Sequence, residues 1–239
     1  MVETLKKNEA PALSKGKKGI NGKVLIEEIK KGLITKEIFM GLGASEKVRI
    51  LMRMKASGSY KDISVLLLGM SDGLESVRKA SRMAFEKVIE QAKANEFIIE
   101  EARQKALSAE PLAKAAGVYA LGLVGKERDF ITLVKAYGDS SLEVQLAAKE
   151  AINLMLSRLE KGELQKAKSQ QVLKLLTADT SAWQKSRCRE CIYMLTGELG
   201  EGQDSIQILK KGIVDEDQKA KQTALRAMKK LKDKGIAQP

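Results

Sequence analysis

Residues 72–88 read DGLESVRKASRMAFEKV, residues 139–155 read DSSLEVQLAAKEAINLM and residues 215–231 read DEDQKAKQTALRAMKKL. Each segment opens with Asp and reaches an apolar or small residue five positions later. Small or apolar residues then recur four, seven and eleven positions beyond that residue. These offsets lie on one face of an α-helix with about 3.6 residues per turn. The three segments therefore predict three copies of one amphipathic helix.

Three further segments, residues 43–57, 108–124 and 179–195, align with the first three. The residue that begins the apolar face in each copy is Val48, Val77, Ala113, Val144, Gln184 or Ala220. An Asp, Ser or Gly stands five positions earlier in every copy, where we expect it to cap the helix. Another apolar segment precedes five of the copies, at residues 62–70, 97–107, 130–138, 169–177 and 204–213. A unit of two antiparallel helices cannot bury both faces alone, so we expect the units to stack.

The composition favours an all-α chain and excludes several kinds of enzyme. Of the 239 residues, 44% are hydrophobic but only 4% are aromatic and 3 are Pro, which argues against a β-sandwich. The absence of His excludes Ser-His-Asp and Cys-His catalysis and every His-ligated metal site. Cys188 and Cys191 form a CxxC pair, but they stand in the small-residue columns of the repeat, which predicts buried packing. We therefore expect no cofactor and no metal, and the sequence favours a non-catalytic protein.

Charge points to an anionic partner. The chain carries 43 Lys and Arg against 31 Asp and Glu, a formal net charge of +12. We expect residues 1–23, rich in Lys and Gly, to be a flexible basic arm, residues 24–233 to form the repeats, and residues 234–239 to be a tail. No leader pattern and no long apolar run are found, so we expect a cytoplasmic protein without a transmembrane segment.

The repeated segments resemble the HEAT repeat over roughly residues 34–233. The features that carry the resemblance are the Asp, the Val followed by a basic residue, and the small residues at one-turn spacing. The resemblance implies a right-handed α-solenoid of about six stacked helical hairpins that binds a macromolecule along its concave side. It also implies a polar ladder between units. Its acidic members are Asp72, Asp139, Asp179 and Asp215, and its basic members are Arg49, Arg78, Lys114, Lys185 and Lys221.

In proteins of this kind the second helix of each hairpin commonly lines the concave side. Four copies of the repeat carry a basic residue five positions after the column. Together with further basic residues and two tyrosines at outward positions, these residues predict a partner-binding strip. Its members are Arg53, Lys79, Arg82, Tyr119, Lys149, Arg189, Tyr193, Arg226, Lys229 and Lys230. We expect a scaffold that binds an acidic surface of a protein partner, with DNA or RNA binding as the alternative. A DNA-repair version would require Glu150 or Glu190 as a catalytic acid, and the scattered aromatic residues do not favour it. The oligomeric state is not indicated.

Overall fold

The computed structural model describes residues 34–57, 63–92, 96–159 and 164–236, and from Thr35 onward the chain forms one compact unit. These residues contain twelve α-helices, two short 3-10 helices and no strand, so the all-α prediction is confirmed. The first six α-helices are α2 (Lys36–Met40), α3 (Ala44–Ser57), α4 (Ile63–Gly69), α5 (Glu75–Ala92), α6 (Glu96–Ala106) and α7 (Pro111–Val124). The other six are α8 (Phe130–Tyr137), α9 (Leu142–Leu159), α10 (Leu164–Ala178), α11 (Ser186–Leu199), α12 (Gln203–Ile213) and α13 (Gln218–Asp233). The predicted basic arm, residues 1–23, lies outside the described residues.

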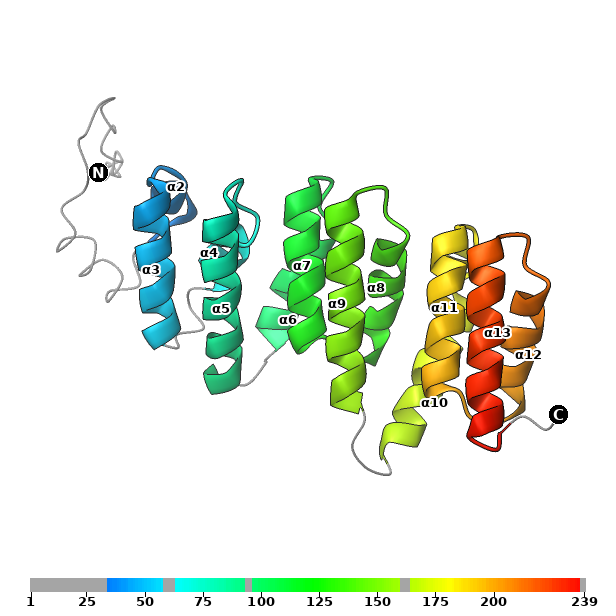
Figure 1. Ribbon diagram of the computed structural model, residues 1–239. Helices are drawn as coiled ribbons and strands as arrows, with labels where there is room; N and C mark the ends of the chain where they lie inside the picture. Colours follow the sequence, from blue (N-terminus) through cyan, green and yellow to red (C-terminus); the bar gives the residue numbers. More distant parts are fainter. Residues whose placement is uncertain (1–33, 58–62, 93–95, 160–163, 237–239) are drawn as a thin grey trace, which may run out of the picture. The chain divides into compact units, whose positions relative to one another are not determined.

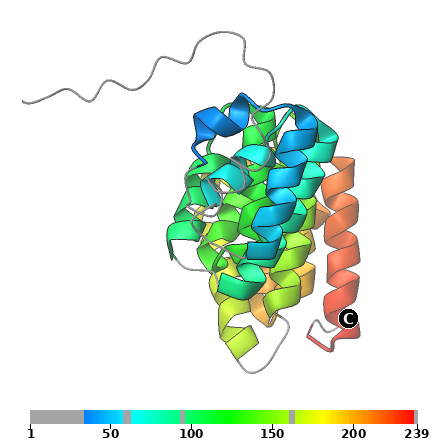
Figure 2. The same ribbon diagram turned by 90° about the vertical axis from the view of Figure 1, so that its left-hand side faces the viewer.

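Within the compact unit the helices form two layers. The odd-numbered helices α3 to α13 face the viewer in Figure 1, and the even-numbered helices α4 to α12 lie behind them. The view turned by 90° in Figure 2 shows the two layers from the side. Neighbours in the chain pack on each other, with α4 on α5, α6 on α7, α8 on α9 and α12 on α13. The predicted pairing of a first helix with the second helix that follows it is thereby confirmed for these pairs.

Packing within the odd-numbered layer alternates between close and wide. Contacts are extensive between α3 and α5, between α7 and α9 and between α11 and α13, but sparse between α5 and α7 and between α9 and α11. Small residues explain two of the close pairs, α7–α9 and α11–α13: a Cβ added at Gly122 would lie 2.5 Å from the Cα atom of Ala151, and one added at Gly197 would lie 2.7 Å from the Cβ atom of Ala227. The layer thus consists of three close pairs separated by an α5–α7 junction and an α9–α11 junction.

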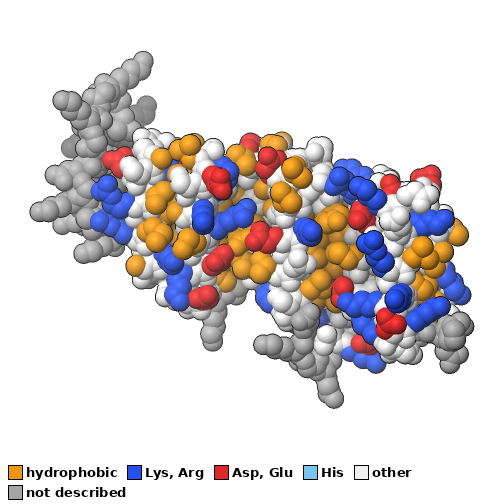
Figure 3. All heavy atoms as spheres, in the orientation of Figure 1, with side chains coloured by type: hydrophobic (Ala, Val, Ile, Leu, Met, Phe, Trp, Pro, Cys, Tyr) orange, Lys and Arg blue, Asp and Glu red, His pale blue; other side chains and the backbone are white. Residues whose placement is uncertain are grey.

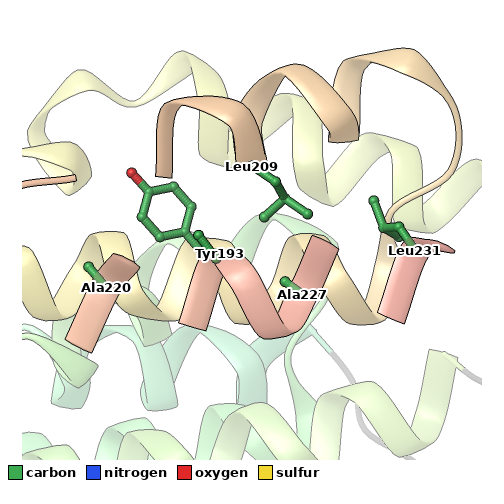
Figure 4. Close-up of a cluster of buried hydrophobic side chains, with 6 residues drawn as sticks. Tyr193, Leu209, Ala220, Ala227 and Leu231 are labelled. Carbon is green, nitrogen blue, oxygen red and sulfur yellow. The ribbon is translucent and has the colours of Figure 1, made fainter. Parts of the chain in front are cut away.

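The repeat columns contribute to the hydrophobic core in most copies, but not in the first, where Met52 is 42% exposed and Ile50, Leu51 and Met54 are buried in place of the predicted column residues. Small residues such as Ala84, Ala148 and Ala224 are fully buried. At the C-terminal end, Figure 4 shows Leu209 of α12 above Tyr193 of α11 and the alanines of α13, which belong to one buried cluster. Cys188 and Cys191 are buried free thiols, as the repeat columns predict, and Cys188 Sγ donates a hydrogen bond to the carbonyl oxygen of Val134 at 3.4 Å.

The Asp column mainly closes turns, which corrects the capping prediction for the α-helices, although Asp179 does cap the 3-10 helix η3 (Thr180–Trp183). In five units a side-chain oxygen accepts the backbone N–H of the residue two positions later, at Asp72, Ser108, Asp139, Asp179 and Asp215. An N-cap residue stands directly before its helix, whereas Asp72 and Asp139 stand three positions before Glu75 and Leu142, the first residues of α5 and α9. Side-chain N-caps on α2, α7 and α13 come from Thr35, Glu110 and Asp217, which lie outside the Asp column.

Candidate partner-binding face

Three basic residues bridge the three close pairs of odd-numbered helices. Nζ of Lys47 lies 2.8 Å from Asp72, Nζ of Lys114 lies 3.0 Å from Asp139, and Arg189 binds both carboxylate oxygens of Asp215 at 2.8 and 3.0 Å. The partners are separated in sequence by 25, 25 and 26 residues. In each bridge a cation on one second helix holds the turn that leads into the next one.

These bridges agree only in part with the polar ladder that the family resemblance implies. The acidic members Asp72, Asp139 and Asp215 are engaged as implied, and Lys114 is a basic partner. The other partners are Lys47 and Arg189 instead of Arg49 and Lys185. Asp179 is paired with Lys135 of α8 at 2.7 Å, and hydrogen bonds from Lys135 and Ser181 lower its pKa to about 2.

Two members of the predicted strip, Arg189 and Tyr193, are used inside the protein. Arg189 also donates to the carbonyl oxygens of Trp183 and Gln184, and its hydrogen bonds lower the pKa of the Asp215 carboxyl. The Tyr193 side chain is buried, and its hydroxyl donates to Asp215 at 3.0 Å. Burial, followed by the hydrogen bond to Asp215, raises the pKa of Tyr193. The expected outward position of Tyr193 is therefore wrong.

Arg82 and Tyr119 fill the α5–α7 junction. The Arg82 guanidinium lies over the Tyr119 ring, 4.5 Å from its centroid, and 3.5 Å from a carboxylate oxygen of Glu150 on α9. The Tyr119 hydroxyl donates a hydrogen bond to Glu86 of α5. Burial and the Glu86 contact raise the pKa of Tyr119, whose side chain is buried and not outward as expected. These four residues, the Arg82 cluster, join α5 to α7 and α9.

A hollow extends from the α9–α11 junction across α11 to α13, and we call it the α9–α11 hollow. Its volume is about 320 Å³, and α8, α9, α11 and α13 contribute its walls. Three predicted strip residues, Lys149, Arg226 and Lys230, meet there. Lys149 and Arg226 are exposed and form no salt bridge with any described residue, whereas Lys230 is paired with Glu198. The hollow thus brings together two predicted cations, Lys149 and Arg226, that form no salt bridge with a described residue.

The hollow also contains residues that the strip prediction missed. Tyr137 ends α8, a helix of the other layer, and Met194 lies on α11 at a position that the repeat columns do not mark. Burial, and next the charge of Glu190, raise the pKa of Tyr137. Glu190, named above only as a candidate acid, lines the hollow too. No sequence signal marks Tyr137 as a residue of this surface, because it lines the hollow only where α9 and α11 stand apart.

The remaining strip residues lie away from the hollow's lining. Arg53 is half-buried on α3, Lys79 is exposed on α5 and Lys229 is exposed on α13. In Figure 3 the odd-numbered layer shows an apolar patch between α9 and α11, with Lys and Arg side chains gathered beside it over α11 and α13. This face combines apolar surface with basic side chains, among which acidic side chains also lie.

Compared with known proteins, the chain matches no protein-family model and no curated protein sequence. No helix in the described ranges has the length and apolarity needed to cross a lipid bilayer. Over the same ranges, no three Cys, Asp or Glu side chains converge in a way that could hold a metal ion.

Proposed function

We propose that this chain is a non-catalytic scaffold, a right-handed α-solenoid of about six HEAT-like hairpins over residues 24–233, that binds an acidic surface of a protein partner. Its sequential packing of twelve helices supports this fold. So do the recurring Asp turns and the cation bridges between partners 25 or 26 residues apart. Such stacked units generally serve as extended binding surfaces.

The observation that carries the proposal is the pair of cations at the α9–α11 hollow. Arg82 and Arg189 already have carboxylate partners within the protein, so an anionic group of another molecule would have to compete with these partners. Lys149 and Arg226 have none among the described residues, and both are exposed. An acidic partner gains their attraction without breaking an internal salt bridge, and complementary charge also speeds encounter.

Charge reversal tests this function. Wild-type protein and the variant Lys149→Glu with Arg226→Glu are cross-linked in native extract and the captured proteins are identified. The control, Lys210→Glu with Lys211→Glu, makes the same change of charge at exposed positions of α12. We expect a specific protein to be captured by the wild type and the control and lost with the hollow variant. Equal capture by all three would refute this binding face.

Nucleic-acid binding is the second candidate, supported by the net charge of +12 and by the two cations at the hollow, Lys149 and Arg226, that no described residue pairs. Phosphate contacts release counterions, so about six of them would weaken binding by roughly 10³-fold between 50 and 200 mM salt. Fluorescent duplex and single-stranded oligonucleotides test this slope. Absence of binding at low salt would eliminate the candidate. A base-repair activity would further depend on Glu190, since Glu150 is paired with Arg82.

A further inference from the structure

The two wide junctions of the odd-numbered layer are built from equivalent positions of the repeat. At the α5–α7 junction, Arg82 stands five places after the repeat column and Tyr119 stands six places after it in the next copy. At the α9–α11 junction these positions hold Lys149 and Glu190. The first pair is in contact through the Tyr119 ring, whereas Lys149 and Glu190 form no salt bridge within the described ranges. One junction is filled by a ring, and the other is open.

The open junction has an apolar floor and a charged rim. Met194 and Ala227, together with the Tyr137 ring, supply apolar surface, and Lys149 and Arg226 supply cations without a salt bridge in the described part of the chain. A volume of about 320 Å³ lies at the lower end of the range for ligand pockets, which suits a side chain and not a whole helix. Met adapts to irregular apolar partners and makes favourable contacts with aromatic rings.

The carboxylates in the hollow determine where acidic groups of a ligand can lie. Glu198 is neutralised by Lys230, but Glu190 has no such partner among the residues described. A carboxylate placed beside Glu190 would be repelled, so an acidic ligand must put an uncharged group there and its charges near Lys149 and Arg226. This arrangement matches an aromatic anchor within an acidic segment, the kind of buried anchor that dominates many protein interfaces.

We infer that the α9–α11 hollow receives one large aromatic side chain of the partner, with Asp or Glu residues on both sides of it that contact Lys149 and Arg226. The inference rests on the proposed function and adds the chemistry of the partner segment. The ring would occupy the α9–α11 junction much as Tyr119 occupies the α5–α7 junction.

Two synthetic peptides test the inference. One consists of Asp and Glu residues with Trp at its centre, and the other has Ser in place of the Trp. Each is titrated into protein labelled with ¹³C at its Met methyl groups, and the Met194 and Met83 signals are followed. Met83 is the internal control, because it is an exposed Met of α5 outside the hollow. We expect the Trp peptide to shift the Met194 signal and to bind about tenfold or more tightly than the Ser peptide.

Variants separate the two parts of the site. Met194→Trp fills the hollow with a side chain of the protein, so it should reduce binding of the Trp peptide to the level of the Ser peptide. Met83→Trp should change neither affinity. The variant Lys149→Glu with Arg226→Glu should weaken both peptides by about tenfold or more. If Met194→Trp fails to fold, as its circular dichroism would show, the charge variant and the methyl signals still decide.

Equal affinity of the two peptides, or a shift of Met83 in place of Met194, would overturn the inference. It would leave the proposed function standing, since an acidic partner would still bind by charge. Failure of both peptides to bind at about 1 mM would overturn the inference as well. The proposed function would then stand or fall on the cross-linking experiment, which does not depend on an aromatic anchor.

Discussion

Replacing Arg189 with Met should destabilise the protein strongly without impairing partner binding. Arg189 makes two hydrogen bonds to Asp215, at 2.8 and 3.0 Å, and one each to the carbonyl oxygens of Trp183 and Gln184. The side chains of Arg189 and Asp215 are only 15% and 4% exposed. Met keeps much of the length and removes the charge, so the variant leaves the Asp215 carboxylate buried without its cation.

The expected loss is about 3 kcal/mol in the free energy of unfolding. Removing one partner of a buried ion pair commonly costs about 3–5 kcal/mol. The lower end applies because Asp215 keeps the Tyr193 hydroxyl and the N–H of Asp217 as donors. For a domain of this size each kcal/mol corresponds to roughly 2–4 °C, so the melting temperature should fall by about 6–12 °C.

Thermal and urea unfolding followed by circular dichroism measure this effect. The matched control is Arg226→Met, at an exposed position without a salt bridge to any described residue, and it should change stability by no more than about 0.5 kcal/mol. Adding Asp215→Asn to Arg189→Met should restore at least about 1 kcal/mol, because the orphaned charge is removed. A melting temperature of Arg189→Met within about 1 °C of the wild type would refute this role. So would a loss of partner binding in a variant that remains folded.

Three other measurements test the packing and electrostatics. Gly117→Ala should destabilise the protein by about 3 kcal/mol or more, because the new Cβ would lie 2.2 Å from a backbone nitrogen of α6. The control is Gly43→Ala, whose new Cβ would meet nothing closer than 3.6 Å. Similar urea midpoints for the two variants would contradict this packing. The pKa values of Asp179 and Asp215 are lowered in the folded state, so their contribution to the free energy of unfolding is present above the unfolded pKa near 4 and is lost as the pH falls. The urea midpoint should therefore decline from about pH 5 toward pH 2. A constant midpoint would count against these pairs. Cys191 is fully buried and its pKa is raised by burial, so a thiol reagent should modify it only on unfolding, and rapid modification with unchanged helicity would be inconsistent with the core.

The repeat columns allowed the helices to be predicted because each helix buries its own apolar stripe. The segment 72–88 contains most of α5, and the segment 215–231 contains most of α13. The buried small residues also follow from these columns, since they are the positions where neighbouring helices approach. Periodicity reports how a helix meets its nearest neighbours, and it is reliable for that reason.

The same columns could not predict which outward positions remain exposed. Tyr119 and Tyr193 point away from the apolar stripes of their own helices, yet neighbouring helices and polar partners cover both. The alternation of close and wide junctions was equally hidden. At two of the close pairs it depends on where Gly meets Ala across two helices, as Gly122 meets Ala151, and that is a property of pairs and not of single columns.

Alternation explains why one column of the repeat serves three different purposes. Five places after the column stand Arg82, Lys149 and Arg189 on α5, α9 and α11. Helix α11 forms a close pair with the helix that follows it in this layer, so Arg189 reaches the Asp215 turn. Helices α5 and α9 instead precede the wide junctions, and neither Arg82 nor Lys149 forms a salt bridge with a turn residue in the described ranges. Tyr119 supplies a ring for Arg82 at the first junction, but Glu190 stands at that position in the second. Lys149 therefore forms no salt bridge with any described residue and lies beside the hollow, which is why we propose this junction as the binding face.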